Sequence, residues 1–160
     1  MRKQRSDFEN LPIASKYFLQ KLGAKVTPQT IDRQLTTHPS FPSVLSLSET
    51  LSDLAIDNMA VSITADRLEE VPFPAVAHFS RGHFVVLDSF ENGQVSYFDP
   101  AKGNITQPVE EFVQEWSGVL LMAELDEKTH RGEESFLFKK YRTPLIVGST
   151  ILLFVLGIIA

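Results

Sequence analysis

The sequence predicts an α+β fold in which helices come first and an antiparallel sheet follows. Before residue 54, apolar side chains recur at helical spacing, and the runs are bounded by capping residues. After residue 58 the period changes, and short alternating or apolar runs lie between turn signals, as expected for antiparallel strands. Helices followed by strands are typical of the α+β class. An uncharged apolar run at the C-terminal end predicts a membrane-spanning helix after this domain.

Three helices are predicted in the first part of the chain. Residues 10–22 carry apolar side chains three or four positions apart, and Gly23 follows as a C-terminal cap. Thr27 precedes a proline, and this pair favours the start of a second helix. After a loop with two prolines, Ser43 is placed to cap a third helix.

The predicted strands are short and separated by turns. Residues 59–63 alternate as a half-buried strand does, and further strands are expected over 75–79, 83–87, 95–98 and 119–124. Glu91-Asn92-Gly93 is a hairpin signal between two of these strands, and residues 99–103 form a turn. Helical segments are expected over 66–70 and 108–116.

The C-terminal run from Pro144 to Ala160 contains 17 residues and no charge. At about 1.5 Å per residue it covers about 26 Å, slightly less than the hydrocarbon core of about 30 Å. The alternative is a buried core helix, but a run that is apolar on all faces at the chain end favours a membrane span.

Basic residues before the span indicate its orientation. Lys139, Lys140 and Arg142 favour the cytoplasmic side of the cell inner membrane for everything that precedes them. We therefore divide the chain into a domain over 1–125, a charged connector over 126–142 and a transmembrane segment over 143–160. The span is either a tail anchor or the first span of a longer protein, and the missing polar anchor beyond it favours the second.

Composition narrows the function classes. The net charge is −5, so no nucleic-acid partner is expected. The 160 residues contain no cysteine, which excludes disulfides, thiolate metal sites and a cysteine nucleophile within them. The four histidines lack metal-ligand spacing and no phosphate loop is present, so neither a metal nor a cofactor is expected.

The most pointed pair of polar residues is His83 with Asp99. His83 opens one predicted strand and Asp99 closes the next, so a hairpin would bring the two side by side. A carboxylate beside an imidazole fixes its tautomer and stabilises the imidazolium, which is the base and its orienting group in a nucleophilic triad. The alternative is a strand-end histidine beside an aspartate that only forms a turn.

The same segments resemble a known family. Residues 82–87 (GHFVVL), 95–103 (VSYFDPAKG) and 116–121 (WSGVLL), in this order, are similar to peptidase family thirty-nine, which contains the double-glycine leader peptidases of bacteriocin-exporting ABC transporters. The resemblance covers roughly residues 8–125 and implies a papain-like fold. It assigns the family's catalytic histidine to His83 and its catalytic aspartate to Asp99.

One departure from the family pattern bears on activity. The family's Asp-Cys-Gly motif supplies the nucleophile, and its cysteine position falls near Asn10, where the chain reads Glu9-Asn10-Leu11. Gln4 is a candidate for the glutamine that helps form the family's oxyanion hole. An amide cannot replace a thiolate as nucleophile. Ser6 and Ser15 are the alternative nucleophiles, although neither stands at the expected position.

The resemblance leads to three hypotheses about function. The first is a catalytically inactive, leader-peptidase-like cytoplasmic domain of a membrane protein that binds a peptide or a partner module. The second is an active peptidase domain of a peptide-exporting ABC transporter with a nucleophile other than cysteine. The third is a purely structural cap on a membrane protein.

A second resemblance concerns the module that would follow the span. Residues 38–51 (HPSFPSVLSLSETL) resemble a branch of the same family in which the domain precedes a vitamin K epoxide reductase-like membrane module. This resemblance implies a thiol oxidoreductase fusion, with the domain as its structural cap. An exporter ABC transporter is the rival parent, and the histidine-proline run favours the reductase slightly.

Overall fold

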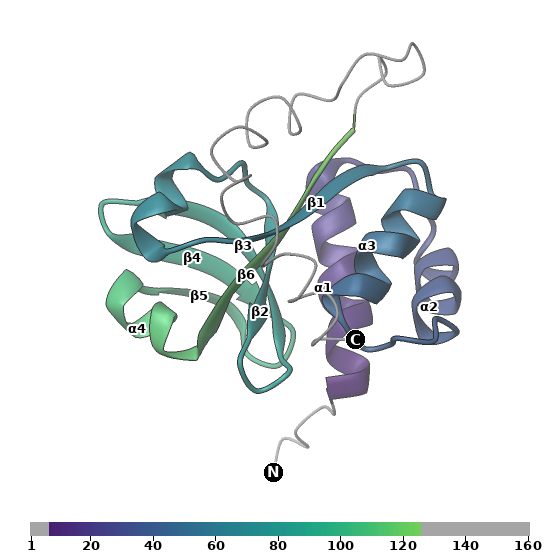
Figure 1. The fold of residues 1–160 in the computed structure, drawn as a ribbon, viewed down its shortest axis with the longest axis horizontal. Coiled ribbons are helices and arrows are strands. Elements are labelled where there is room, and N and C mark those ends of the chain that lie inside the picture. The colour runs from purple at the N-terminus through teal and green to yellow at the C-terminus, as the bar shows by residue number, and fades with distance from the viewer. Residues whose placement is uncertain (1–6, 126–160) are drawn as a thin grey trace.

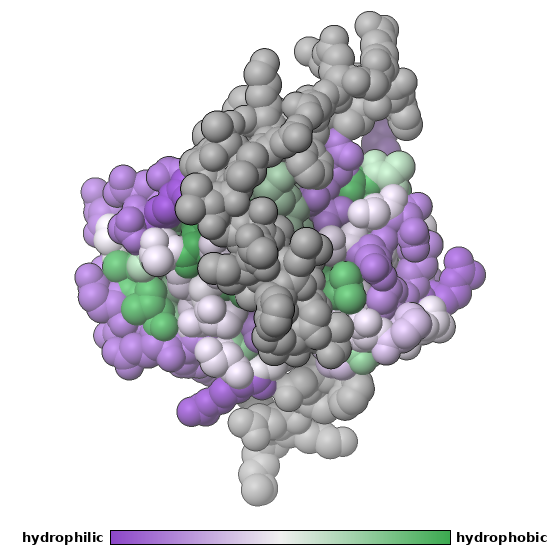
Figure 2. Space-filling view, in the orientation of Figure 1, coloured by the Kyte–Doolittle hydropathy of each residue, from purple (hydrophilic) through white to green (hydrophobic). Residues whose placement is uncertain are grey.

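The computed structural model describes residues 7–125, which form an α+β fold as predicted. Three helices, α1 (Asp7–Leu22), α2 (Pro28–Thr36) and α3 (Val44–Asp53), form one layer. The second layer is a six-stranded antiparallel sheet in the order β1-β6-β2-β3-β4-β5. Its strands are β1 (Asp57–Ser62), β2 (Ala75–Phe79), β3 (Phe84–Glu91), β4 (Gln94–Asp99), β5 (Gly103–Pro108) and β6 (Trp116–Glu124). The helices lie beside the sheet, and their outer surface is mostly hydrophilic (Figures 1 and 2).

Two short helices cover the opposite face of the sheet. They are the 3-10 helix η1 (Ala65–Glu70) and α4 (Val109–Glu115), which contribute Leu68 and Phe112 to the core on that side. Among residues 7–125, no helix is both long and apolar enough to cross a bilayer. The predicted connector over 126–142, the predicted span over 143–160 and Gln4 lie outside the described residues.

The predicted capping residues start the helices that they were expected to start. The Thr27 side chain accepts a hydrogen bond from the backbone N–H of Thr30. Ser43 forms a reciprocal capping box with Ser46, in which each side chain accepts from the other's backbone N–H. The first helix begins at Asp7 rather than at residue 10 and continues through Pro12. Pro12 is the sixth residue of α1, so it lacks the N–H that would donate to the preceding turn, although the helix continues past it.

The sheet differs from the prediction mainly at its edge. β3 continues to Glu91, beyond the predicted end at residue 87, because the hairpin at Asn92-Gly93 keeps it paired with β4. The strand β5 was not predicted, since Ile105 is its single aliphatic residue other than proline. An edge strand buries only one face and lacks a second neighbour, so its apolar pattern is weak.

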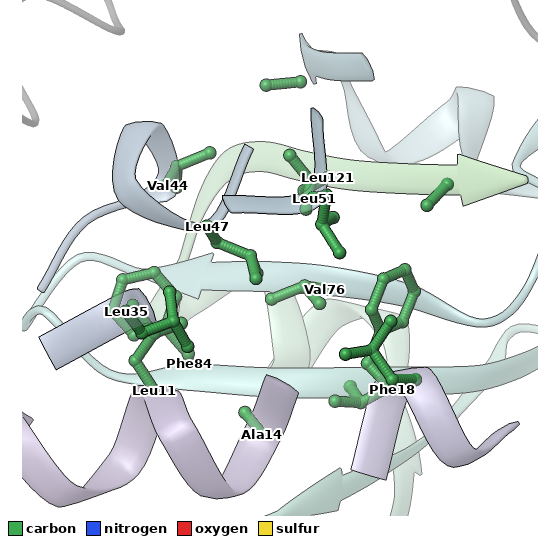
Figure 3. Packing of buried hydrophobic residues seen from close by; sticks show 14 of the residues in the cluster. Leu11, Ala14, Phe18, Leu35, Val44, Leu47, Leu51, Val76, Phe84 and Leu121 are labelled. Carbon is green, nitrogen blue, oxygen red and sulfur yellow. The ribbon is translucent and has the colours of Figure 1, made fainter. Parts of the chain in front are cut away.

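The core on the helix side fixes α1 against the sheet. Leu11, Ala14 and Phe18 project from α1 towards Val76 of β2 and Phe84 of β3 (Figure 3). Leu121 of β6 lies beyond Val76, its partner in the sheet. This packing positions the first turns of α1 next to the start of β3. The candidate site is built at that point.

Candidate active site

The candidate site lies where β3 begins and β4 ends. The hairpin between these strands turns through Asn92 and Gly93, whose φ values of 51° and 73° suit a tight Asn-Gly turn. The two strands are therefore antiparallel neighbours, and His83, just before β3, lies beside Asp99, the last residue of β4. Nε2 of His83 is 3.1 Å from Oδ1 of Asp99.

Asp99 is buried and is held by the turn that follows it. Its side chain is 2% exposed, and Oδ1 accepts hydrogen bonds from the N–H groups of Ala101 at 2.7 Å and Lys102 at 3.3 Å. The same carboxylate thus closes the turn and faces the imidazole. The two readings of this residue from the sequence, turn former and histidine partner, both describe the structure.

Asn10 reaches the site from α1. Its Oδ1 accepts the N–H of Phe84 at 2.6 Å, and its Nδ2 lies 3.3 Å from Nε2 of His83. The bond to Phe84 fixes the orientation of the amide, because only the oxygen can accept a hydrogen bond. Asn10 is 2% exposed. The side chain therefore links α1 to the start of β3 and presents an amide N–H to His83.

The imidazole nitrogen Nε2 faces two groups with different requirements. Asp99 needs a hydrogen on Nε2, whereas the amide N–H of Asn10 needs a lone pair there. A neutral ring satisfies one of these partners in each tautomer, and a protonated ring favours Asp99. The His83 side chain is 24% exposed. A bound molecule can therefore contact the ring and change which of the two partners it bonds to.

The chemistry that this arrangement supports is incomplete for covalent catalysis. A carboxylate beside a histidine provides a base and its orienting group, but the third group present is a carboxamide rather than a thiol or hydroxyl. Ser15 does not supply the missing group, because it is fully buried and its hydroxyl donates to the carbonyl of Leu11 at 2.7 Å. Ser6 lies outside the described residues. Within residues 7–125, no three His, Cys, Asp or Glu side chains are grouped to hold a metal ion.

An aromatic cluster also lies beside the histidine. The rings of His83 and Phe79 are 6.1 Å apart, and Phe79 contacts Tyr97 and Phe112. Burial, followed by the negative charge of Asp99, raises the pKa of Tyr97 to about 12. Sequence reasoning missed the roles of Tyr97 and of the Phe84 N–H. The period of the strand places Tyr97 on the same face as Asp99, whereas nothing in the sequence indicates the backbone contact.

The sequence matches a known protein family over most of its length. The Peptidase C39 family matches residues 1–128 of the chain. The lactococcin-G-processing and transport ATP-binding protein LagD of Lactococcus lactis is 29% identical over 109 residues, which cover 64% of this chain and 16% of that protein. The chain thus spans about a sixth of the length of this relative.

Solved structures share the fold at low sequence identity. A double glycine motif protease from an AMS/PCAT transporter, solved with its leader peptide, superposes with a TM-score of 0.67 at 19% identity, over 79% of this chain and 90% of that one. The peptidase domain of Streptococcus ComA gives 0.65 at 15%, over 77% and 96%. The peptidase C39 like domain of a Vibrio parahaemolyticus toxin secretion protein gives 0.59 at 14%, over 73% and 97%. The match over residues 1–128 shows that this chain belongs to the Peptidase C39 family, and the fold that it shares with the solved peptidase domains agrees with this assignment.

Proposed function

We propose that the chain is a non-cleaving leader-peptide-binding domain of a peptide-exporting membrane transporter. The observation that carries the proposal is the Asn10 amide, which is held by the Phe84 N–H and faces His83. In the family resemblance, this is the position of the nucleophile. The His83–Asp99 pair is retained beside it.

The chemistry of the amide argues against peptide cleavage. Acyl transfer needs a nucleophile with an available lone pair, such as a thiolate or an activated hydroxyl. The nitrogen lone pair of a carboxamide is delocalised into its carbonyl group, and the chain has no cysteine that could act instead. Asn10 is also buried, so a peptide carbonyl would have to displace packed side chains to reach it. Among the described residues, the side chains that face Nε2 of His83 are an amide and a carboxylate, and deprotonation by His83 turns neither into a nucleophile for attack.

Peptide binding, unlike cleavage, does not need a nucleophile. A partly exposed imidazole and the strand ends around it can offer hydrogen bonds to an extended chain without any covalent step. Support comes from the fold shared with a protease solved in complex with its leader peptide, and from the relative whose name describes processing and transport of lactococcin G. The proposal includes a position on the cytoplasmic side of the cell inner membrane, next to the transporter's membrane module, which the basic residues Lys139, Lys140 and Arg142 support. The reductase-like fusion stays a prediction.

The test uses the full chain in detergent micelles, because residues 144–160 are apolar. A synthetic leader peptide that ends in Gly-Gly and continues for several residues is titrated against ¹⁵N-labelled protein, and the mixture is then followed by mass spectrometry. We expect shifts around His83 and Asp99 with the peptide intact. A matched peptide with the Gly-Gly pair replaced by two valines serves as the control ligand.

Two other outcomes would overturn the proposal. Cleavage after Gly-Gly that is lost in His83→Ala would show an active peptidase. An unchanged spectrum at saturating peptide would favour a structural cap. Cleavage that survives His83→Ala would point to a contaminating protease, and the titration would then be repeated on repurified protein.

A further inference from the structure

A second set of side chains anchors α1 to the sheet, away from the candidate site. The hydroxyl of Tyr17 donates to Oδ2 of Asp88 at 2.8 Å. The ring of Tyr17 stacks on Phe98, with centroids 4.1 Å apart and planes 12° from parallel. Nζ of Lys21 lies 3.7 Å from Oδ1 of Asp88 and 5.3 Å from the Tyr17 ring centroid. We name these four residues the Tyr17 clamp.

The backbone directs Asp88 towards this clamp. The register of β3 and β4 shifts between Leu87 and Ser89, which leaves Asp88 as the extra residue of a β-bulge. Bulges redirect a side chain and increase the local twist of a strand. Burial, and then the hydrogen bond to Asp88, raise the pKa of Tyr17, so the phenol keeps its proton and remains a donor.

The clamp residues come from α1, β3 and β4, the three elements that also form the candidate site. Asn10, Ala14, Tyr17 and Lys21 follow one another at helical spacing, so they form one stripe on α1 that faces the sheet. Asp88 belongs to β3, which begins beside His83, and Phe98 directly precedes Asp99 on β4. Tyr17 lies about two helical turns, or about 10 Å, along α1 from Asn10.

Apolar packing alone does not fix the position of a helix along a strand. Hydrophobic contacts are non-directional, so a helix can shift slightly and keep most of its burial. A hydrogen bond loses strength steeply when its distance or angle changes. The Tyr17–Asp88 bond, together with the close stacking on Phe98, therefore determines how far along β3 and β4 the helix α1 sits. The fully buried Ala14 between the two anchors allows close approach.

We infer that the Tyr17 clamp is a positioning device that holds residue 10 on the Phe84 N–H and against His83. The inference deepens the proposed function, on which it rests for the importance of residue 10 to the site. Tyr17 contacts no peptide in this scheme; it acts through the placement of α1. The alternative is that the clamp only adds stability to the domain.

Tyr17→Phe tests the inference because it removes the hydroxyl and keeps the stacked ring. Hydrogen exchange of two β3 amides is compared in the full chain: Phe84, which bonds to Asn10, and Val86, which lies deeper in the same strand. We expect the Phe84 amide to exchange about tenfold faster, which corresponds to the loss of about one hydrogen bond, while Val86 changes less. The ¹⁵N shifts of the His83 ring, which report its tautomer, should move as well.

Matched variants separate positioning from stability. Lys16→Met removes the ion pair between Lys16 and Asp32, which joins α1 to α2 rather than to the sheet, and should leave Phe84 and His83 unchanged. Asp88→Asn keeps an acceptor for Tyr17 and should stay near wild type, whereas Asp88→Leu should resemble Tyr17→Phe.

Equal acceleration of Phe84 and Val86, or no change in either with the His83 tautomer unmoved, would overturn the inference. These measurements use no peptide. A failure of leader-peptide binding would therefore refute the proposed function without deciding the role of the clamp.

Discussion

Replacement of Asn10 by alanine should destabilise the domain more than the loss of one surface contact would. The substitution leaves the Phe84 N–H buried without its acceptor at 2.6 Å. A buried donor left unsatisfied costs about 1–3 kcal/mol, and loss of the second contact, to His83, adds about 1 kcal/mol at most. We therefore expect the free energy of unfolding to fall by about 1–4 kcal/mol.

The assay is urea unfolding of the full chain, followed by the fluorescence of its single tryptophan, the buried Trp116. The slope m should stay constant, so that the midpoint reports stability. Ser15→Ala is the matched control, because it also removes a buried polar group from α1 but leaves no donor without a partner. If Asn10→Ala and Ser15→Ala agree within about 0.5 kcal/mol, the argument that Asn10 satisfies a buried N–H is wrong.

Three further predictions concern reactivity, capping and pH. Asn10→Cys should create a thiol that small alkylating reagents modify at neutral pH. Its rate should exceed that of the same thiol in the Asn10→Cys, His83→Ala double variant, because an adjacent imidazole promotes the thiolate. Equal rates would show that His83 is not placed as a base. Ser43→Ala should lower the free energy of unfolding by about 1 kcal/mol, which is more than Thr27→Ala should cost. The reason is that the capping box at Ser43 is buried, whereas the N-cap at Thr27 is exposed. A larger loss for Thr27→Ala in urea unfolding would contradict this. The pKa of Tyr97 is raised to about 12 in the folded state. The contribution of Tyr97 to stability is therefore complete below about pH 10, the pKa of an unfolded tyrosine, and is lost as the pH rises towards 12. Wild type should lose stability over that window faster than Tyr97→Phe, and parallel pH profiles of stability would refute the assignment.

The sequence predicts those parts of the structure that local chemistry determines. Thr27 and Ser43 start helices because an N-cap hydrogen bond lies within one turn of the capping residue. The approach of His83 to Asp99 is also predictable, since a single Asn-Gly turn aligns the strand ends. In each case, the residues that decide the outcome are close in sequence or are joined by one recognisable turn.

The parts that could not be predicted depend on tertiary contacts. The acceptor for the Phe84 N–H is a side chain from α1, and no local pattern marks it. The Tyr17–Asp88 bond likewise joins residues far apart in sequence, and Asp88 is directed to it by a bulge that the alternation of side chains does not reveal. The edge strand β5 carries too weak an apolar pattern to be recognised before its neighbour β4 is in place.

The histidine–aspartate pair does not by itself indicate an active enzyme. Asp99 would be required in a domain without catalysis, because its carboxylate holds the turn through the N–H groups of Ala101 and Lys102. Once this carboxylate is fixed, a histidine at position 83 has a partner whether or not a nucleophile is present. Under the proposed function, the two states differ at residue 10, where the family resemblance expects the nucleophile and where Asn10 instead accepts a hydrogen bond from the Phe84 backbone. Asn10→Cys therefore bears most directly on this proposal when its stability is measured beside its reactivity, whereas a change to Asp99 also removes the acceptor that holds the turn.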